Sequence, residues 1–531
     1  MTKSNLIKVA GLIAVITILS KLVGFLRDVV TAGAYGATTI SDAYFYAYQI
    51  PAFALILLGG LGGPFHTATI AVFSKIIPDI EEKPSKEVQS LLNSFITITG
   101  ICFLALTILV WIFADPIIKA IAANASPELH NLATLQLKIM APIMLIGGVI
   151  GILYGISNVY KEFMFTALSP TMVSIVIIGA ILVFRNDSTG IILAWGTLIG
   201  ALVQLLIQLP VFFKSGFTYK PEFKFFDEKI KNIRKILLPA MIGTTIGQIN
   251  IYVDMFFASQ LIAGAWTAIG YANRIFQFPV GIIITALLVP LFPMFSTFVG
   301  KRDWDSLKYY FHRGLTSLWF MSFPILAFII IFAQDGIKLL LERGQFDAND
   351  TYMVSLALIY LSISIIPYVA RDTLTRVFYA FDDSKTPFYV AMVSIIVKAT
   401  LNFMLIGHLG IGAITLSTTA VTIINCLLLA IFIRNKIDLE FKQFISPTLK
   451  IIFATLTMSA IAFGFKWYFE QAMPDTLLYL TLKLTICGVI SIIVYFITGK
   501  LLKLGAAEHV LERLKTMICK KPITDTAISG E

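Results

Sequence analysis

Charged side chains interrupt long apolar stretches of this sequence, and they are the residues with the most informative chemistry. Arg27 and Asp28 stand inside the apolar run 9–33, and Arg274 stands inside the run 267–298. A charge at the centre of a membrane-spanning helix costs roughly 2.5–3.5 kcal/mol on insertion scales. Such residues therefore face a bundle interior or a water-filled cavity, as a substrate path or as buried ion pairs.

The charges inside apolar runs include more bases than acids. They are Lys21, Arg27, Asp28, Asp42, Asp254, Arg274, Arg371, Asp372, Arg376 and Lys398. An excess of positive charge suits an anionic substrate, and the planar fork of a guanidinium matches two phosphate oxygens at once. This favours a binding role for Arg27 and Arg274. Ion pairs between helices are the favoured interpretation for four others: Asp42, Asp254, Asp372 and Lys398.

Helical spacing places the charged residues of run 9–33 on different faces of the predicted helix. Lys21, Gly24 and Asp28 share one face of a helix. Arg27 is turned from Asp28 by about 100°, so we predict that these neighbours do not pair with each other and that Arg27 lines the same wide cavity. Three lysines near the ends of apolar runs are expected to extend towards the membrane surface: Lys138, Lys450 and Lys483.

The composition identifies a membrane protein. The hydrophobic fraction is 57% and the charged fraction is 14%, whereas soluble domains carry about 25% charged residues. Since about 20 apolar residues span a bilayer, the sequence predicts an all-α polytopic protein of about fourteen transmembrane helices. The predicted spans are 9–33, 42–74, 90–113, 132–156, 164–184, 190–213, 234–262, 267–298, 311–333, 352–380, 388–407, 411–433, 447–468 and 477–502.

Lys and Arg in the connecting loops predict the orientation. With the N-terminus in the cytoplasm, the outer loops hold few basic residues: Lys119, Arg185, Lys338, Arg343 and Lys466. The remaining loop bases fall on the inner side. We therefore expect both termini in the cytoplasm. This asymmetry accounts for the net charge of +10 without a nucleic-acid partner.

A weak internal repeat predicts two lobes. Asp28 followed by Gln49-Ile50-Pro51 corresponds to Asp254 followed by Gln277-Phe278-Pro279 at similar spacing. Because an even number of helices separates the copies, the repeat is parallel, with its axis along the membrane normal. The predicted division is an N-lobe at 1–215, a cytoplasmic linker at 216–233, a C-lobe at 234–435, two further helices at 436–505 and a cytoplasmic tail at 506–531.

Three further patterns bear on mechanism. The stretch Gly59-Gly60-Leu61-Gly62-Gly63-Pro64, followed by His66, is expected to break a helix near mid-membrane. The aromatic set Tyr44, Phe45, Tyr46 and Tyr48 predicts either sugar contacts or, preferably, an interfacial belt. The lysine-rich loop 214–235 is interpreted as a linker, with binding of acidic headgroups as the alternative.

No signature of an enzyme is evident. The sequence contains no GxxxxGK[ST] phosphate loop, HExxH or GxSxG motif, so we expect a transporter driven by substrate or ion gradients. The cysteines Cys102, Cys426, Cys487 and Cys519 are scattered and predict neither disulfides nor a metal site. No cofactor is expected.

Several motifs together resemble the MurJ (MviN) family of the MOP exporter superfamily. They are Ser20-Lys21-Leu22-Val23-Gly24-Phe25-Leu26-Arg27-Asp28, Gly36, Asp42-Ala43-Tyr44, Ile50-Pro51, Tyr271-Ala272-Asn273-Arg274-Ile275-Phe276-Gln277-Phe278-Pro279, Phe378-Tyr379-Ala380 and Lys385-Thr386-Pro387. The resemblance covers all predicted helices. It implies two six-helix lobes around a cationic cavity, a groove for a lipid tail formed by the last two helices, and flipping of lipid II, the undecaprenyl-diphosphate-linked peptidoglycan precursor.

The resemblance also implies a substrate-binding set. Lys21 matches a basic position, Arg27 and Asp28 match an arginine–acid pair, Arg274 matches a cavity arginine, and Asp42 matches a further functional acid. Many members carry an arginine and an Ala-Glu-Gly-Ala stretch where this chain has Leu55-Ile56 and the glycine run, a form typical of the cyanobacterial branch. We expect Arg371 or Arg376 to supply the missing charge.

The predicted function is therefore lipid II translocation to the outer leaflet by alternating access. Its partners would be lipid II, membrane lipids and cell-wall synthesis proteins. The alternatives are another exporter of the superfamily, for polysaccharide repeats or for drugs and cations, and a non-transporting scaffold for cell-wall assembly.

Overall fold

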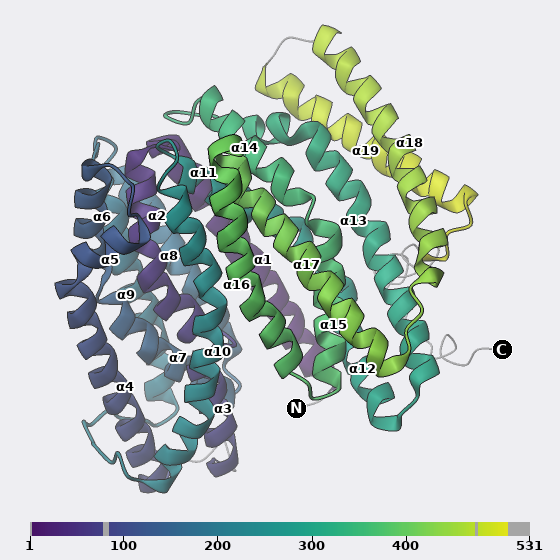
Figure 1. The fold of residues 1–531 in the computed structure, drawn as a ribbon. Helices are drawn as coiled ribbons and strands as arrows, with labels where there is room; N and C mark the ends of the chain where they lie inside the picture. The colour runs from purple at the N-terminus through teal and green to yellow at the C-terminus, as the bar shows by residue number, and fades with distance from the viewer. Residues whose placement is uncertain (1–2, 78–83, 473–475, 508–531) are drawn as a thin grey trace. The chain divides into compact units, whose positions relative to one another are not determined.

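Helices connected by short loops make up the parts of the chain that its computed structural model describes, which are residues 3–77, 84–472 and 476–507 (Figure 1). Contacts divide it into two compact units. The first comprises Met1–Ala268 and Leu341–Asp350, and the second comprises Ile269–Leu340 and Thr351–Glu531. The predicted tail lies outside the described residues from 508 onward, as does Cys519. The predicted lobe boundaries stay a prediction, since no observation here tests them.

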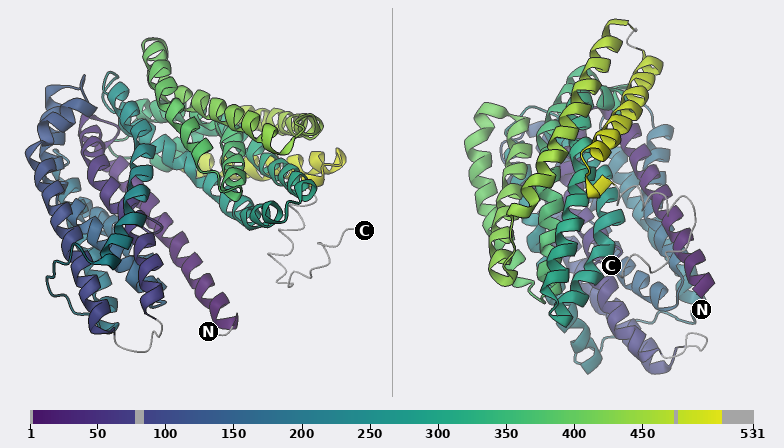
Figure 2. Two further views of the ribbon diagram at one scale, coloured as in Figure 1. Left: turned by 60° about the horizontal axis from the view of Figure 1, so that its bottom comes forward. Right: turned by 90° about the vertical axis from the view of Figure 1, so that its right-hand side faces the viewer.

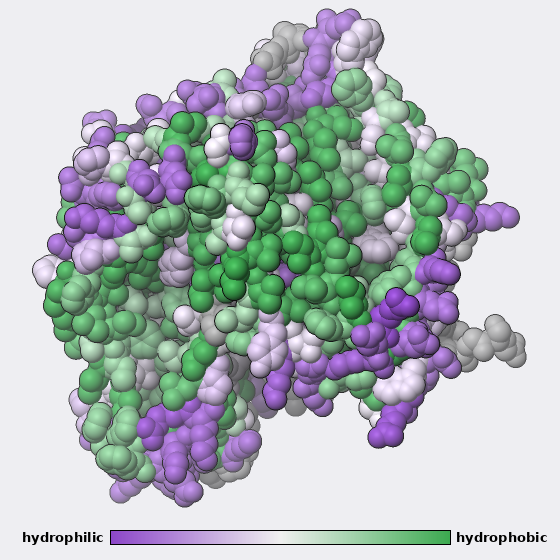
Figure 3. All heavy atoms as spheres, viewed as in Figure 1, coloured by the Kyte–Doolittle hydropathy of each residue, from purple (hydrophilic) through white to green (hydrophobic). Residues whose placement is uncertain are grey.

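The first unit is built from the N-terminal helices. They are α1 (Lys3–Tyr35), α2 (Thr39–Ala52), η1 (Phe53–Leu58), α3 (Pro64–Ile76), α4 (Lys86–Ile112), α5 (Ala114–Ile121), α6 (Pro127–Met140), α7 (Ile143–Val159), α8 (Phe163–Val183), α9 (Ile191–Lys214) and α10 (Glu228–Ala258). Apolar residues cover the middle of its visible face, and polar residues gather towards the two ends (Figure 3). That banding is the pattern of a membrane protein.

The second unit takes most of the remaining helices. They are α11 (Ala265–Ile283), η2 (Ile284–Leu288), α12 (Val289–Lys301), α13 (Trp304–Leu341), α14 (Ala348–Ser362), α15 (Ile365–Ala380), α16 (Lys385–Leu409), α17 (Ile411–Ile437), α18 (Lys442–Ala472) and α19 (Leu477–Leu501). The helices α18 and α19 lie side by side in every view (Figures 1 and 2). The first turn of α11 belongs to the first unit.

Membrane-spanning length is common among these helices. Within the described residues, nine helices are long and apolar enough to cross a bilayer, and two bent pairs raise the number to as many as eleven. The bent pairs are α6 with α7, at 41°, and α14 with α15, at 47°. Each predicted apolar run corresponds to one helix or to a broken series of helices, so the structure is compatible with the predicted fourteen spans.

Helix starts in the first unit follow ordinary capping chemistry. The Ser85 hydroxyl accepts from the Val88 N–H at the start of α4, and the Ser126 hydroxyl accepts from the Leu129 N–H at the start of α6. Pro127 follows Ser126 directly, at a position where its missing N–H costs no intrahelical bond. These caps fix where α4 and α6 begin.

The predicted break in the second apolar run is confirmed. The chain passes from α2 through the π-helix η1 into the non-helical glycine stretch, and α3 restarts at Pro64. The corresponding region of the second unit, between α11 and α12, also contains a π-helix, η2. Because π-helical turns are rare, their occurrence after Pro51 and after Pro279 supports the internal repeat.

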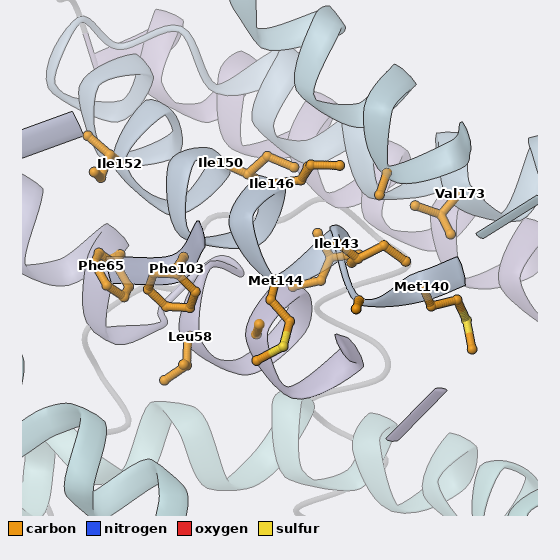
Figure 4. Packing of buried hydrophobic residues seen from close by; sticks show 14 of the residues in the cluster. Leu58, Phe65, Phe103, Met140, Ile143, Met144, Ile146, Ile150, Ile152 and Val173 are labelled. Atoms are coloured by element: carbon orange, nitrogen blue, oxygen red, sulfur yellow. The ribbon is translucent and has the colours of Figure 1, made fainter. Parts of the chain in front are cut away.

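Glycines on α7 let the broken helix approach closely. A Cβ atom on Gly59 would lie 1.9 Å from the Gly147 carbonyl oxygen, and one on Gly155 would lie 2.3 Å from the Thr69 Cβ. Small residues at four-residue spacing are a common helix-packing device in membranes. Beside this contact the Phe65 and Phe103 rings meet edge to face at 5.5 Å, within an apolar core drawn in Figure 4.

One prediction follows from the contact between α7 and α3. Gly155→Ala should destabilise the protein by about 1–3 kcal/mol, the usual penalty for overpacking a tight core, because backbone-proximal atoms of Thr69 occupy the space. Thermal unfolding of the purified protein measures the change. The matched control is Gly179→Ala on α8, where no atom lies within 4 Å of the new Cβ. Equal melting temperatures for the two variants would contradict the predicted clash.

Candidate functional site

Arg27 and Asp28 form an ion pair, so the prediction that they do not pair was wrong. Arg27 Nε and Nη2 both donate to Asp28 Oδ1, at 3.1 and 2.8 Å. The arginine side chain is long enough to bend back across the angle between adjacent residues on α1. Asp28 is buried, while 21% of the Arg27 side chain remains exposed. A guanidinium carries five N–H donors, and these two bonds leave the Nη1 group available to a phosphate.

Two other features of α1 frame this pair. Lys21 is exposed, two turns before Asp28 on the shared face that the spacing predicts. On the neighbouring helix α2, the Tyr44 and Tyr48 rings stack at 5.6 Å, and the Tyr44 hydroxyl bonds to Thr197 Oγ1 at 2.8 Å.

The preferred interpretation of the α2 aromatics as an interfacial belt was wrong for two of them. Tyr44 is 5% exposed, and Tyr46 is fully buried with its hydroxyl donating to the Met255 carbonyl of α10 at 2.9 Å. In α2 these tyrosines lie on the face that packs against neighbouring helices. Their hydroxyls therefore satisfy buried polar groups instead of reaching the membrane surface.

Asp42 caps another helix. Its Oδ2 accepts from the Gly264 N–H at 2.7 Å, and its Oδ1 accepts from the N–H and the hydroxyl of Thr267, at 2.8 and 2.7 Å. These groups open α11, where unsatisfied N–H groups and the helix dipole favour a carboxylate. Both oxygens are engaged, so the geometry gives Asp42 a positioning role for α11, the helix that carries Arg274 further along.

A second carboxylate, that of Asp350, also accepts a hydrogen bond from a backbone N–H. Asp350 Oδ2 accepts from the Ala37 N–H at 2.9 Å, just before α2 begins. The Gln345 N–H donates to the Gly33 carbonyl of α1, also at 2.9 Å. The segment Leu341–Asp350 thereby holds the turn between α1 and α2 within the first unit. Nothing in its sequence spacing indicated this long-range contact.

In the second unit, α11 and α15 bring aromatic and basic groups together. The Arg274 guanidinium lies 5.6 Å from the centre of the Tyr271 ring on the same helix. The Phe276 ring of α11 meets the Tyr368 ring of α15 edge to face at 6.0 Å, and Arg371 lies over that Tyr368 ring at 4.3 Å. Two of the predicted binding cations therefore lie on helices in direct contact.

Arg371 and Arg376 share one acid. Asp372 lies 4.0 Å from Arg371 Nη2 through Oδ1 and 3.9 Å from Arg376 Nη2 through Oδ2. All three side chains are about a quarter exposed. The prediction of an ion pair between helices was wrong for Asp372, because both of its partners lie on its own helix. The trio keeps a positive excess.

The turn after α15 is fixed by Asp383. This carboxylate accepts from the N–H and the hydroxyl of Thr386, at 3.0 and 2.8 Å, and from Lys436 Nζ at 2.5 Å. The hydrogen bond from Lys436 is the largest contribution that lowers the pKa of Asp383, to about 2. The carboxylate therefore stays charged and ties the end of α15 to α16 and α17.

His66 was noted in the sequence but not placed in the site. It is buried, and its Nδ1 accepts from the Gly62 N–H at 2.9 Å while its Nε2 lies 2.6 Å from the Asn158 amide of α7. His66 thus fastens the glycine stretch between η1 and α3 to α7. The histidine that directly follows a glycine break was the available signal.

Likeness to a solved structure defines the fold class of the protein. A multidrug resistance MATE family transporter of the MOP superfamily, in its inward-facing conformation, matches with a TM-score of 0.62 at 14% identity over 81% of this chain and 98% of that one. At that identity the likeness shows the fold alone. The chain is thus a polytopic membrane protein with the fold of MOP-superfamily transporters.

The family is then shown by sequence. The family model "Lipid II flippase MurJ" matches residues 31–498, and the chain belongs to that family, which comprises transporters and not enzymes. A probable lipid II flippase MurJ of Synechocystis is 33% identical over 434 residues, covering 79% of this chain and 80% of the relative. A probable lipid II flippase MurJ of Buchnera aphidicola subsp. Acyrthosiphon pisum is 30% identical, covering 86% and 90%.

Structure agrees with sequence. The lipid II flippase MurJ in an inward closed conformation matches with a TM-score of 0.76 at 25% identity, covering 92% of this chain and 98% of that one. The family resemblance stated from the motifs is confirmed, including its cyanobacterial likeness.

A test of the Asp42 cap follows. Asp42→Asn should destabilise the protein by roughly 1–3 kcal/mol, the cost of leaving a buried group without its partner, because an amide N–H would face the Gly264 N–H. Thermal unfolding and the yield of monodisperse protein measure the effect. Asp115→Asn is the matched control, since its carboxylate pairs with Lys119 at an exposed position. A wild-type melting temperature for Asp42→Asn would rule out the cap.

Proposed function

We propose that this chain flips lipid II, carrying the undecaprenyl-diphosphate-linked peptidoglycan precursor from the cytoplasmic to the outer leaflet by alternating access. Membership of the MurJ family supports this assignment. The observation that carries it is Arg27, placed on a largely apolar helix with 21% of its side chain exposed and with Nε and Nη2 both bonded to Asp28 Oδ1. A diphosphate is the ligand for which such a fork is suited.

The binding set is proposed in two groups. In the first unit, Lys21 and Arg27 contact the diphosphate, Asp28 orients Arg27, and Asp42 positions α11. In the second unit, Arg274, Arg371 and Arg376 contact it. The aromatic rings of Tyr271 and Tyr368 hold two of these arginines by cation–π contact, which restricts their side chains before the substrate arrives.

The chain lacks the helix-two arginine common in the family, and α15 provides the substitute. At that region Leu55 is buried in the apolar core and Ile56 is exposed, so neither side chain can bind an anion. On α15 one carboxylate serves two guanidinium groups, which leaves a net positive charge beside Tyr368. We assign the missing diphosphate contact to this trio.

The alternative functions fit the charges in these helices less well. A carrier of cationic drugs requires acidic or neutral cavity groups, whereas bases predominate here. A scaffold for cell-wall assembly has no need of charges at membrane depth, which are costly to insert. A flippase for polysaccharide repeats also carries a diphosphate lipid, so the sugar portion of the substrate separates that case from lipid II.

The proposed location is the bacterial plasma membrane, with both termini in the cytoplasm. Its support is the distribution of Lys and Arg among the loops. The partners in this setting are lipid II and the surrounding membrane lipids, together with cell-wall synthesis proteins that consume the flipped precursor.

The central functional prediction concerns the arginines of α1 and α11. Arg27→Ala and Arg274→Ala should each abolish rescue of a bacterium depleted of its own lipid II flippase, because each loses a charge-assisted contact worth roughly 1.5–3 kcal/mol. Growth after depletion is the measurement, with protein levels in the membrane checked by immunoblotting. Arg185→Ala, in an exposed loop, is the control and should support growth. Growth of both site variants at the wild-type rate would contradict the binding role.

A separate prediction concerns α15. The double variant Arg371→Gln/Arg376→Gln should impair rescue more than either single change, since Asp372 can orient whichever arginine remains. The readout is the growth rate of the same depleted strain at matched expression. Unimpaired growth of the double variant would show that the missing charge is not supplied by α15.

A further inference from the structure

The long helix α13 has two interruptions in its backbone hydrogen bonding. It runs for 38 residues from Trp304 to Leu341 and contains Pro324 and the non-helical Phe332, with φ −114° and ψ 16°. A proline has no N–H for the carbonyl four residues earlier, which is that of Phe320. In the hydrocarbon core no water is available to satisfy such a group. The Phe320 carbonyl therefore needs a donor from elsewhere in the protein, and the non-helical backbone at Phe332 is a second irregular point.

Both donors come from the last two helices. The Tyr495 hydroxyl of α19 donates to the Phe320 carbonyl at 2.7 Å. Lys466 Nζ of α18 donates to the Ile331 carbonyl, directly before Phe332, also at 2.7 Å. Tyr495 is 2% exposed, so this hydroxyl is shielded from solvent. The pair α18–α19 thus completes the backbone of α13 at both breaks.

A compact group of charges lies beside the second break. Lys483 Nζ of α19 is 2.6 Å from Asp335 Oδ1, and Lys466 Nζ is 3.6 Å from Asp335 Oδ2. Glu470 lies 3.9 Å from Lys466 and 4.0 Å from Lys483. The expectation that Lys483 extends to the membrane surface was wrong, since its side chain is only 11% exposed. Two bases and two acids balance, so this cluster is suited to join helices and not to bind an anion.

Apolar packing fills the space between the two breaks. The Phe320 ring packs against Tyr495 at 4.7 Å, and a Cβ on Gly499 would lie 3.1 Å from Phe320 Cε2. Near Phe332, a small core joins Ala462 and Phe469 of α18 to Cys487 of α19. Contacts between α13 and the helix pair thus occur at Phe320, at Phe332 and at Asp335.

Beyond Asp335, α13 leads directly into the segment Leu341–Asp350. That segment belongs to the first unit, where it bonds to Gly33 at the end of α1 and to Ala37 before α2. The chain thus connects the α13–α18–α19 assembly to the outer end of the helix that carries Arg27. A change in the bend at Phe332 would alter the direction in which this connection leaves α13.

We propose that α18 and α19 hold α13 in its bent form, so that the three helices move as one body and the bend sets the position of segment 341–350 during transport. Asp335, Lys466, Lys483 and Tyr495 are then positioning residues that act at a distance from the substrate. This inference rests on the proposed transport function for its biological role, but the bend itself can be measured without substrate.

The test measures the bend directly. Spin labels are attached at Tyr309→Cys near the start of α13 and at Leu340→Cys near its end, an exposed and a half-buried position of the second unit, after Cys102, Cys426, Cys487 and Cys519 have been replaced by alanine and rescue has been verified. Pulsed electron–electron resonance on the purified protein then gives the distribution of distances between the labels. In Lys466→Met and in Tyr495→Phe the distribution should broaden and its maximum should shift beyond the wild-type width.

Matched control variants distinguish a change in the bend of α13 from a general loss of protein stability. Tyr468→Phe on α18 and Lys500→Met on α19 remove the same chemical groups from exposed positions and should leave the distribution unchanged. Lys466→Arg retains a donor for the Ile331 carbonyl and should restore the wild-type distribution, which a merely destabilised site would not do. A wild-type distribution in both Lys466→Met and Tyr495→Phe would overturn the proposal.

Growth rescue tests whether the bend of α13 matters for transport. The two variants that change the bend should lose rescue of a flippase-depleted strain, while Lys466→Arg should keep it. If the bend changes and rescue persists, the coupling to transport is wrong. If the wild-type chain itself fails to rescue while the resonance result holds, the proposed function fails and the bend is still established.

Discussion

The cost of placing a polar group in hydrocarbon governs this structure. Each charge or unbonded carbonyl at membrane depth requires a partner, and the chain meets this requirement in different ways. Arg27 takes Asp28 beside it, Asp42 takes the start of α11, and the interrupted carbonyls of α13 take Lys466 and Tyr495. Where the pairing is complete, the group joins helices. Where it is partial, as at Arg27, the remaining hydrogen-bond capacity is available for an anionic ligand.

The same distinction separates the two sets of charges in the second unit. Around Asp335 the two lysines and two acids balance, and the lysines are mostly buried. Around Asp372 two arginines share one acid, and all three are partly exposed. The first set therefore joins helices, while the second can receive a diphosphate. Charge balance together with exposure separates the two roles better than the mere presence of a charge in an apolar run.

Much of the architecture could be predicted from the sequence, because apolar length and glycine content act locally. The broken second run, the helical class and the family followed from residues near one another, such as Gly59–Pro64. Side-chain partners could not be predicted in the same way. Spacing alone gave the wrong answer for Arg27, whose flexible side chain reaches its neighbour, and for Lys483, whose partner Asp335 is distant in sequence. The caps made by Asp42 and Asp350 also depend on long-range contacts.

The most direct test of the account is whether the protein distinguishes lipids by their diphosphate. Purified protein in detergent should bind undecaprenyl diphosphate much more tightly than undecaprenol, as measured by native mass spectrometry or by quenching of tryptophan fluorescence. In the double variant Arg27→Ala/Arg274→Ala the difference between the two affinities should shrink, while Arg185→Ala should keep it. Equal affinity of the wild-type protein for the two lipids, or an unchanged preference in the double variant, would contradict the claim that these arginines hold the head group.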